Sequence, residues 1–144
     1  MSDPFLEQRL IEHEGIKKSA YNDSRGYLTI GIGFLIDPKM NAGLSIEECM
    51  MILRSRILNL ERQLSQYPWF NIQDQVRKGV LIEMAYNLGV NGLLGFKNMI
   101  AALGDRQVGT AAVEMGKSLW ATQIGQARLK DMQGRMREGS YKGK

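Results

Sequence analysis

The stretch EGIKKSAYNDSRGYLTIGIG, residues 14–33, decides how the first third of the chain folds. Gly15 is typical of the position just beyond a helix C-terminus, and the tetrapeptide Asp23–Gly26 has the composition of a tight turn between two strands. After this turn, residues 27–33 alternate between aliphatic side chains on one face and polar side chains or glycines on the other. The stretch therefore predicts a helix that ends at residue 14 and a β-hairpin from residue 19 to residue 32.

The two carboxyl groups of this stretch, Glu14 and Asp23, lie in different settings. Asp3 and Pro4 predict the start of the first helix. Helical spacing then puts Glu14 beside Leu10, on the face expected to meet the core. Partial desolvation and the negative end of the helix dipole both favour a protonated Glu14, while Asp23 is the group kept ionised. One protonated and one ionised carboxyl group are what hydrolysis of a glycosidic bond requires, so the pair predicts a glycosidase.

Thr29 lies on the strand face that we expect to form the floor of a cleft. A hydroxyl at this place can hold the attacking water, which favours inversion at the sugar carbon. Taken singly, each residue also has a structural interpretation: Asp23 as a turn-opening aspartate, Glu14 as an exposed glutamate at a helix end, and Thr29 as a strand former. The conjunction favours catalysis, because the helix end and the hairpin can bring all three side chains to one rim.

The rest of the chain is predicted to be helical, after a loop from Leu35 to Gly43. The capping box Ser45–Glu48 begins the longest helix, which extends to about Tyr67 and breaks at Pro68. Further helices are predicted from about residues 71–74 to Gly89, and over residues 96–103, 108–117 and 123–137.

These elements indicate an α+β fold with two lobes. We expect a single domain over residues 1–144, with a small antiparallel β-hairpin lobe at about 14–45 and a connecting helix at 46–67. The helical lobe, at 68–138, is expected to pack with the N-terminal helix.

The composition of the chain argues against several other classes of protein. The 144 residues suit one globular domain, and the formal net charge is +4. A single cysteine, Cys49, and a single histidine, His13, exclude an intrachain disulfide and a structural zinc site of Cys and His ligands. The pair Gly31 and Gly33 lacks the third glycine and the following helix of a dinucleotide-binding motif. We expect no metal and no cofactor.

Residues 14–15 and 21–33 closely resemble the catalytic signature of the phage-type lysozymes, the endolysin family. The resemblance continues through Ala85–Gly89, Gly92–Phe96 and Lys117–Trp120, so it extends over most of the chain. It implies a lysozyme-like fold and muramidase activity: hydrolysis of the β-1,4 bond between N-acetylmuramic acid and N-acetylglucosamine in peptidoglycan, with inversion.

The resemblance also implies roles for single residues. By position, Glu14 is the general acid, Asp23 orients water or stabilises positive charge, and Thr29 holds the water. The residues that match positions lining the saccharide cleft are Gly33, Leu35, Tyr86, Asn87 and Phe96, whereas Trp120 matches a core position.

Some positions depart from the family pattern. Phe34 stands where many relatives have histidine, so an ion pair between the lobes cannot form there. Relatives commonly have an arginine that faces the catalytic glutamate, and here the register is shifted so that Arg128 is its substitute. Met99 and Glu114 stand where some relatives present small polar groups to the sugars.

The expected partner is the glycan strand of peptidoglycan, with no nucleic acid and no stable membrane insertion, and we expect a monomer. The N-terminus lacks the features of a secretory signal, so we expect synthesis in a host cytoplasm and action on the cell wall after release or injection by a separate holin or tail assembly. Two alternatives are a catalytically silent wall-binding or scaffold module and a small nucleic-acid-binding domain that uses the basic segment from Lys117 onward.

Overall fold

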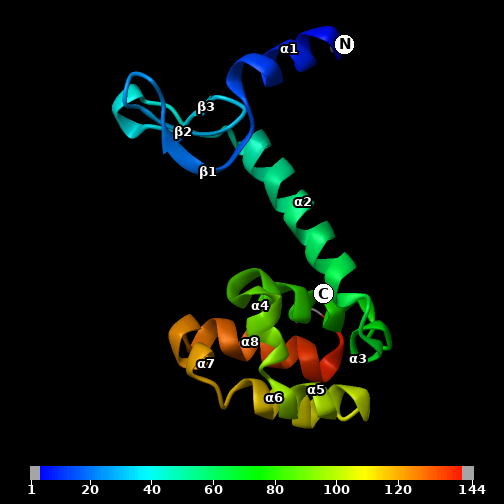
Figure 1. Ribbon diagram of the computed structural model, residues 1–144. Coiled ribbons are helices and arrows are strands. Elements are labelled where there is room, and N and C mark those ends of the chain that lie inside the picture. Colours follow the sequence, from blue (N-terminus) through cyan, green and yellow to red (C-terminus); the bar gives the residue numbers. More distant parts are fainter. Residues whose placement is uncertain (1–3, 141–144) are drawn as a thin grey trace. The chain divides into compact units, whose positions relative to one another are not determined.

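The computed structural model describes residues 4–140, and its chain divides into two compact units, Met1–Ile52 and Leu53–Lys144. The long helix α2, Ile46–Leu64, contributes residues to both units (Figure 1). The first unit holds a three-stranded antiparallel sheet, and the second is built from helices. The predicted α+β class is confirmed. Within residues 4–140, no helix is both long enough and apolar enough to span a bilayer.

Helix α1, Pro4–Glu14, ends at the predicted residue. Gly15 closes it with a φ of +73° and donates its N–H to the Ile11 carbonyl at 2.8 Å. The apolar side chains of α1 are exposed, so the first unit does not bury them: Phe5, Leu6, Leu10 and Ile11. The expected packing of this helix on the helical lobe stays a prediction, and the capping residue Asp3 lies outside the described residues.

The sheet has the strand order β1-β2-β3, with strands Lys17–Asn22, Leu28–Gly31 and Phe34–Leu35. The predicted hairpin corresponds to β1 and β2. The third strand, β3, was not anticipated, because two residues are too few to show an alternating pattern. Thr29 stands in the middle of the sheet, opposite Tyr21 on β1 and Leu35 on β3.

Asp37, two residues after β3, links the segment that follows β3 to the start of β2 by hydrogen bonds from its carboxylate. It caps the short 3-10 helix η1, Pro38–Met40, by accepting a hydrogen bond from the Lys39 N–H at 2.9 Å. Its other carboxylate oxygen accepts from the Leu28 N–H, also at 2.9 Å. These bonds, the one from Leu28 first, lower the pKa of Asp37 below its ordinary value of 3.8.

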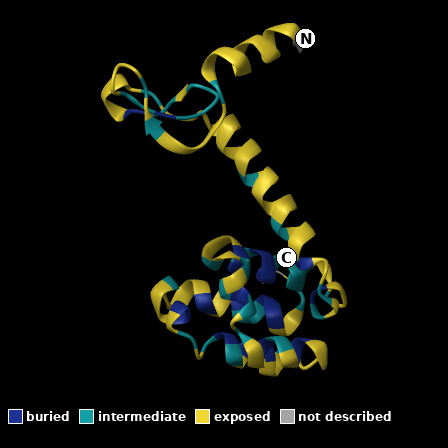
Figure 2. Cartoon of the chain, in the orientation of Figure 1, coloured by how far each residue is buried: buried dark blue, intermediate teal, exposed yellow. Residues whose placement is uncertain are grey.

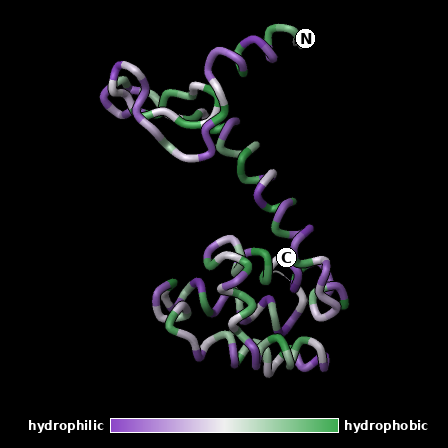
Figure 3. Tube along the Cα trace, in the orientation of Figure 1, coloured by the Kyte–Doolittle hydropathy of each residue, from purple (hydrophilic) through white to green (hydrophobic). Residues whose placement is uncertain are grey.

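The predicted capping box at the start of α2 is confirmed. The Ser45 N–H donates to the Glu48 carboxylate at 2.8 Å, and the Glu48 N–H donates to the Ser45 hydroxyl oxygen at 3.0 Å. Helix α2 alternates between hydrophobic and hydrophilic stretches along its length (Figure 3).

In the second unit, α6 packs against α5 and α8, α4 and α7 each pack against α8, and α3 contacts α4 and α5. The bounds of these helices are α3 Pro68–Asn71, α4 Gln75–Leu94, α5 Lys97–Gly104, α6 Val108–Met115, α7 Leu119–Ile124 and α8 Gln126–Glu138.

Several helix boundaries differ from the predictions: α2 ends at Leu64 instead of about Tyr67, the short helix α3 was not expected, and α6 ends at Met115 instead of residue 117. Two further differences lie at glycines. The helix expected over residues 123–137 is two helices, because Ser118 caps the separate helix α7 and Gly125, at φ +87° and ψ 157°, interrupts the helical path. Gly89, predicted to close a helix, instead lies at a kink inside α4 with φ +78° and ψ 160°.

The core of the second unit is rich in leucine and methionine, and its buried residues line the inward faces of the helices (Figure 2). Methionine is flexible and polarisable, so it can fill the irregular spaces between short helices. The largest side chains with under 2% exposure are Leu64, Phe70, Val80, Leu81, Met84, Leu93, Met99, Leu103, Met115, Met132 and Met136.

Replacing Gly89 with alanine tests the kink. A Cβ at Gly89 would meet no atom within 4 Å, so only the backbone conformation opposes the change. We expect Gly89→Ala to lower the free energy of unfolding by about 1–3 kcal/mol. Gly134, inside α8 and also open on the Cβ side, is the matched control: Gly134→Ala should raise that free energy by about 0.5–1 kcal/mol. Urea unfolding measures both, and a stabilised Gly89→Ala variant would contradict the kink.

The lowered pKa of Asp37 predicts a pH dependence of stability. Because its pKa is lower in the folded state, the Asp37 carboxylate stabilises fully above the unfolded-state pKa, and this contribution is lost as pH falls through the folded-state pKa. We therefore expect the difference in unfolding free energy between the wild type and Asp37→Asn to be largest near neutral pH and to shrink below about pH 4. Urea unfolding between pH 7 and pH 2.5 measures it. A difference that is constant with pH would be contrary to this prediction.

Candidate active site

The carboxylate of Glu14 lies directly over Gly33. A Cβ atom on Gly33 would be 2.5 Å from Glu14 Oε2 and 2.8 Å from its carboxyl carbon, closer than real side chains approach each other. Gly33 also has a φ of +66°, a conformation that disfavours any residue with a Cβ. Only glycine at position 33 leaves room for the Glu14 carboxylate. This contact gives a physical reason for the prediction that Gly33 belongs to the site.

Strand pairing brings the end of α1 to this glycine. Lys17, at the start of β1, pairs with Gly31 at the end of β2, and only Gly15 and Ile16 separate Glu14 from β1. The turn that follows β2 therefore has to lie beside the C-terminus of α1. Glu14 itself is exposed within the first unit, as is Leu10, so this unit does not supply the desolvation that helical spacing predicted.

Asp23 organises the turn between β1 and β2. Its Oδ1 accepts hydrogen bonds from the N–H groups of Arg25 and Tyr27, both at 2.9 Å. Its own N–H donates to the Tyr27 carbonyl at 2.8 Å, and Gly26 donates to the Asp23 carbonyl at 2.9 Å. Among the described residues of the first unit Oδ2 accepts no hydrogen bond, so in this unit one oxygen of Asp23 holds the turn and the other is unoccupied.

Thr29 is 3% exposed, which differs from the open strand face that the alternation predicted. The reason is its central position, between Tyr21 and Leu35 on the two flanking strands. Its hydroxyl donates to the Tyr27 carbonyl at 2.9 Å, so the hydroxyl oxygen keeps lone pairs for a further donor. Asp23 and Thr29 thus share one acceptor, the carbonyl of Tyr27.

Strand β3 begins with an exposed aromatic residue. Phe34, the residue that departs from the family pattern, is 50% exposed. Its ring lies against Gly31, where a Cβ would be 2.6 Å from ring carbon Cδ2. Leu35, predicted to bind substrate, is half-buried on β3.

In the second unit, Trp120 brings two of the predicted binding residues together. The indole Nε1–H of Trp120 donates to Asn87 Oδ1 at 2.7 Å, and the Phe96 ring meets the indole edge to face, with centroids 6.0 Å apart. Trp120 is 5% exposed, so its predicted core position is confirmed. Tyr86, next to Asn87 on α4, is 49% exposed.

Arg128 is paired within the second unit. Its guanidinium contacts Glu83 on α4, with Nε and Nη2 both 3.1 Å from Oε2. Glu83 also accepts from Arg135 at 2.8 Å, and Arg135 in turn contacts Asp131 at 2.8 Å. Burial lowers the pKa of Arg135, but the bonds to Glu83 and Asp131 outweigh this and the net shift is upward. Glu83 was missed, although a charge inside the apolar run of residues 80–85 was a visible signal.

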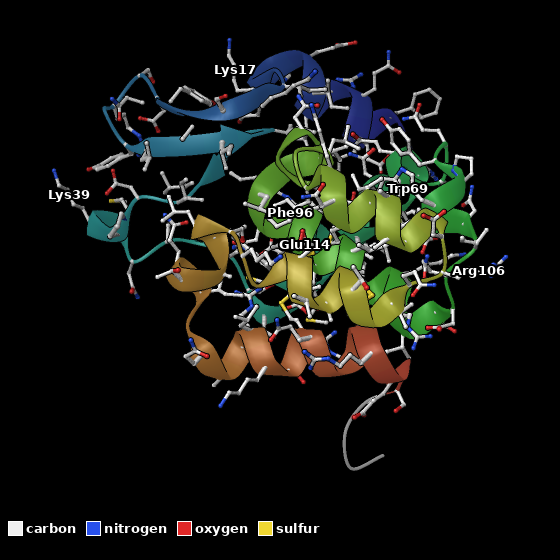
Figure 4. The ribbon with its side chains drawn as sticks, turned by 90° about the horizontal axis from the view of Figure 1, so that it is seen from below. Lys17, Lys39, Trp69, Phe96, Arg106 and Glu114 are labelled. Carbon is white, nitrogen blue, oxygen red and sulfur yellow. The ribbon has the colours of Figure 1, made fainter. Side chains whose placement is uncertain are left out.

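Phe96 also borders a surface hollow of about 380 Å³ in the second unit. Glu114 also lines this hollow and pairs with Lys117 at 2.8 Å; Phe96 and Glu114 are labelled in Figure 4. The bond from Lys117, with a further one from Asn98, lowers the pKa of Glu114. Met99 at the base of the hollow is 1% exposed.

Among the described residues, no three acidic, histidine or cysteine side chains come together in a way that could hold a metal ion.

Comparison with known proteins identifies relatives of this chain. The family described as Phage lysozyme matches residues 11–138. "Probable T4-type lysozyme 1" of Dictyostelium discoideum is 26% identical over 82% of this chain and 85% of its own length, and "Probable T4-type lysozyme 2" of the same organism is 25% identical over the same shares. The "Pre-baseplate central spike protein Gp5" of Enterobacteria phage T4 is 26% identical over 82% of this chain, but over only 25% of its own length. Since the family match extends over nearly all of the described sequence, this chain belongs to the phage lysozyme family and is a glycoside hydrolase of the lysozyme type.

Proposed function

We propose that this protein hydrolyses the β-1,4 bond between N-acetylmuramic acid and N-acetylglucosamine in peptidoglycan, with Glu14 as general acid and Asp23 and Thr29 acting on the attacking water. The observation that carries the proposal is the position of the Glu14 carboxylate over Gly33, one short turn away from the strand that holds Thr29. An acid at the end of a helix and a carboxylate in the adjacent turn provide both groups that glycoside hydrolysis needs.

Glu14 suits the role of acid by its position, because its carboxyl group is accessible beside the turn that follows β2. Among the described residues of the first unit it makes no hydrogen bond and no ion pair, and Glu14 is exposed in that unit. A protonated Glu14 would donate to the oxygen of the leaving sugar.

Asp23 and Thr29 suit the handling of water. The available Oδ2 of Asp23 can accept a proton from the water, and the Thr29 oxygen can accept a hydrogen bond while its own proton is held by the Tyr27 carbonyl. In an inverting enzyme the two carboxyl groups stand about 6.5–9.5 Å apart, which leaves room for this water on the far side of the sugar. We propose inversion because Asp23 and Thr29 can together hold and deprotonate such a water.

We propose saccharide-contacting residues in each unit, taken separately. In the first unit these are Gly33 and Leu35. In the second unit Tyr86 offers an exposed ring, and Asn87 and Phe96 are held in place by Trp120. Arg128 would offer its guanidinium group to the saccharide when it leaves Glu83. We propose that the enzyme meets its substrate, the glycan strand, in the bacterial cell wall. One relative is a spike protein by its name, so delivery by a tail assembly is one proposed route. Release through a holin is the other.

Removing the acid proton tests the proposal. We expect Glu14→Gln to lower the initial rate of wall clearing about 10²–10⁴-fold, because an amide cannot protonate the leaving oxygen. Glu12→Gln is the matched control: Glu12 lies on the same helix and is also exposed, and its change should leave the rate within about twofold. Turbidity loss of a suspension of purified walls measures the rates.

Two outcomes of this experiment would count against the proposal. Equal clearing by the wild type and Glu14→Gln would remove Glu14 as the acid. A wild type that cosediments with walls but releases no reducing sugar would support a silent wall-binding module. Proton NMR of the first product then tests inversion, since the α-anomer has to appear before mutarotation.

The contact between Glu14 and Gly33 makes a second prediction. In Gly33→Ala the new Cβ would push the Glu14 carboxylate away, so we expect the clearing rate per folded molecule to fall at least about tenfold. Gly43→Ala is the control, because Gly43 also has a positive φ, +143°, but its Cβ would meet no atom within 4 Å. Both variants should lose stability, and only Gly33→Ala should lose activity beyond that loss. Equal activities per folded molecule would show that the contact does not matter.

A further inference from the structure

A third carboxylate of the first unit, Asp37, is 8% exposed and has no part in the proposed reaction. It is one of two buried residues among the described residues of that unit, and the other is Thr29. A carboxylate with so little access to water needs hydrogen bonds from the protein. Asp37 has two, from the N–H of Leu28 and the N–H of Lys39.

The Leu28 N–H belongs to the same peptide group as the Tyr27 carbonyl. That carbonyl accepts the N–H of Asp23 at 2.8 Å and the hydroxyl of Thr29 at 2.9 Å. A peptide group is planar and rigid, so an anchor at its N–H end also fixes the direction of its carbonyl end. Asp37 therefore anchors the N–H end of the Tyr27–Leu28 peptide group. The carbonyl end of the same group accepts hydrogen bonds from two of the proposed catalytic residues, Asp23 and Thr29.

An anion at the N–H end also strengthens the carbonyl as an acceptor. Hydrogen bonds through one peptide group polarise each other, and the bond from an N–H to a carboxylate is the stronger, charge-assisted kind. The carboxylate is well suited to remain ionised, because the N–H groups of Leu28 and Lys39 lower the pKa of Asp37.

We infer that Asp37 is a positioning residue, whose carboxylate orients the Tyr27–Leu28 peptide group and thereby sets both the Asp23 carboxylate and the Thr29 hydroxyl for attack by water. The inference rests on the proposed function of Asp23 and Thr29. Asp37 does not touch the sugar, so it acts on the rate of reaction and not on the binding of the glycan.

The substitution Asp37→Asn tests this role at nearly constant size. An amide has one acceptor oxygen, so it can satisfy the Leu28 N–H or the Lys39 N–H but not both. On soluble peptidoglycan fragments, and corrected for the folded fraction by circular dichroism, we expect kcat to fall at least about tenfold while KM stays within about twofold of the wild type.

Glu48→Gln is the matched control. Glu48 is another carboxylate of the first unit, and its pKa is likewise lowered by a backbone N–H, that of Ser45. This bond caps α2 and has no link to the Tyr27–Leu28 peptide group. We expect Glu48→Gln to lose some stability and to keep kcat within about twofold of the wild type.

A second variant separates the two bonds of Asp37. Serine is a good N-cap, so Asp37→Ser should keep the bond to Lys39 and lose the bond to Leu28. A low kcat in this variant supports the positioning role. If kcat per folded molecule in Asp37→Asn and Asp37→Ser equals that of the wild type, the inference is overturned, even when both variants melt at a lower temperature.

If neither variant folds, hydrogen exchange of the wild type provides the test. The Leu28 amide should exchange as slowly as the paired amides of β1 and β2, and exchange at the rate of an exposed turn would overturn the inference. An inactive wild type would instead contradict the proposed function, so the two failures can be told apart.

Discussion

The Glu14 carboxylate fills the space that a side chain on Gly33 would need, and the geometry of the proposed site depends on this contact. It exists because the chain between α1 and β1 is only two residues long, which leaves little freedom in where the helix can end relative to the sheet. The pairing of Lys17 with Gly31 then fixes the turn that holds Gly33. A longer connection would let Glu14 move away from the turn, and the acid would no longer have a defined position.

The two units are stabilised by different means. In the second unit aliphatic and methionine side chains form a buried core. Among the described residues of the first unit, the two buried residues are both polar, Thr29 and Asp37. The small sheet therefore depends on hydrogen bonds to its backbone more than on apolar burial. A unit with so few buried apolar contacts is expected to open locally more easily than its neighbour.

Local signals in the sequence predicted the elements that such signals control. The glycine after Glu14, the aspartate that opens the turn and the capping box at Ser45 each act over four residues or fewer, and each has the predicted effect. The features that were missed depend on contacts distant in sequence. Thr29 is buried because a third strand of two residues covers it, and Asp37 was overlooked because its partner Leu28 is nine residues away. The break at Gly125 was a local signal that the apolar pattern around it concealed.

The two arginines that pair with Glu83 differ in how strongly they are held. Glu83 bridges two guanidinium groups that differ in exposure: the side chain of Arg135 is 8% exposed and that of Arg128 is 42% exposed. Breaking an exposed ion pair costs about 0–1 kcal/mol, whereas leaving a buried charge unpaired costs about 3–5 kcal/mol. If Arg128 moves to a ligand, Arg135 stays compensated by Glu83 and Asp131. Arg128 is therefore the member of the cluster that can be released at small cost, and Arg135 is the member that keeps Glu83 in place for its return.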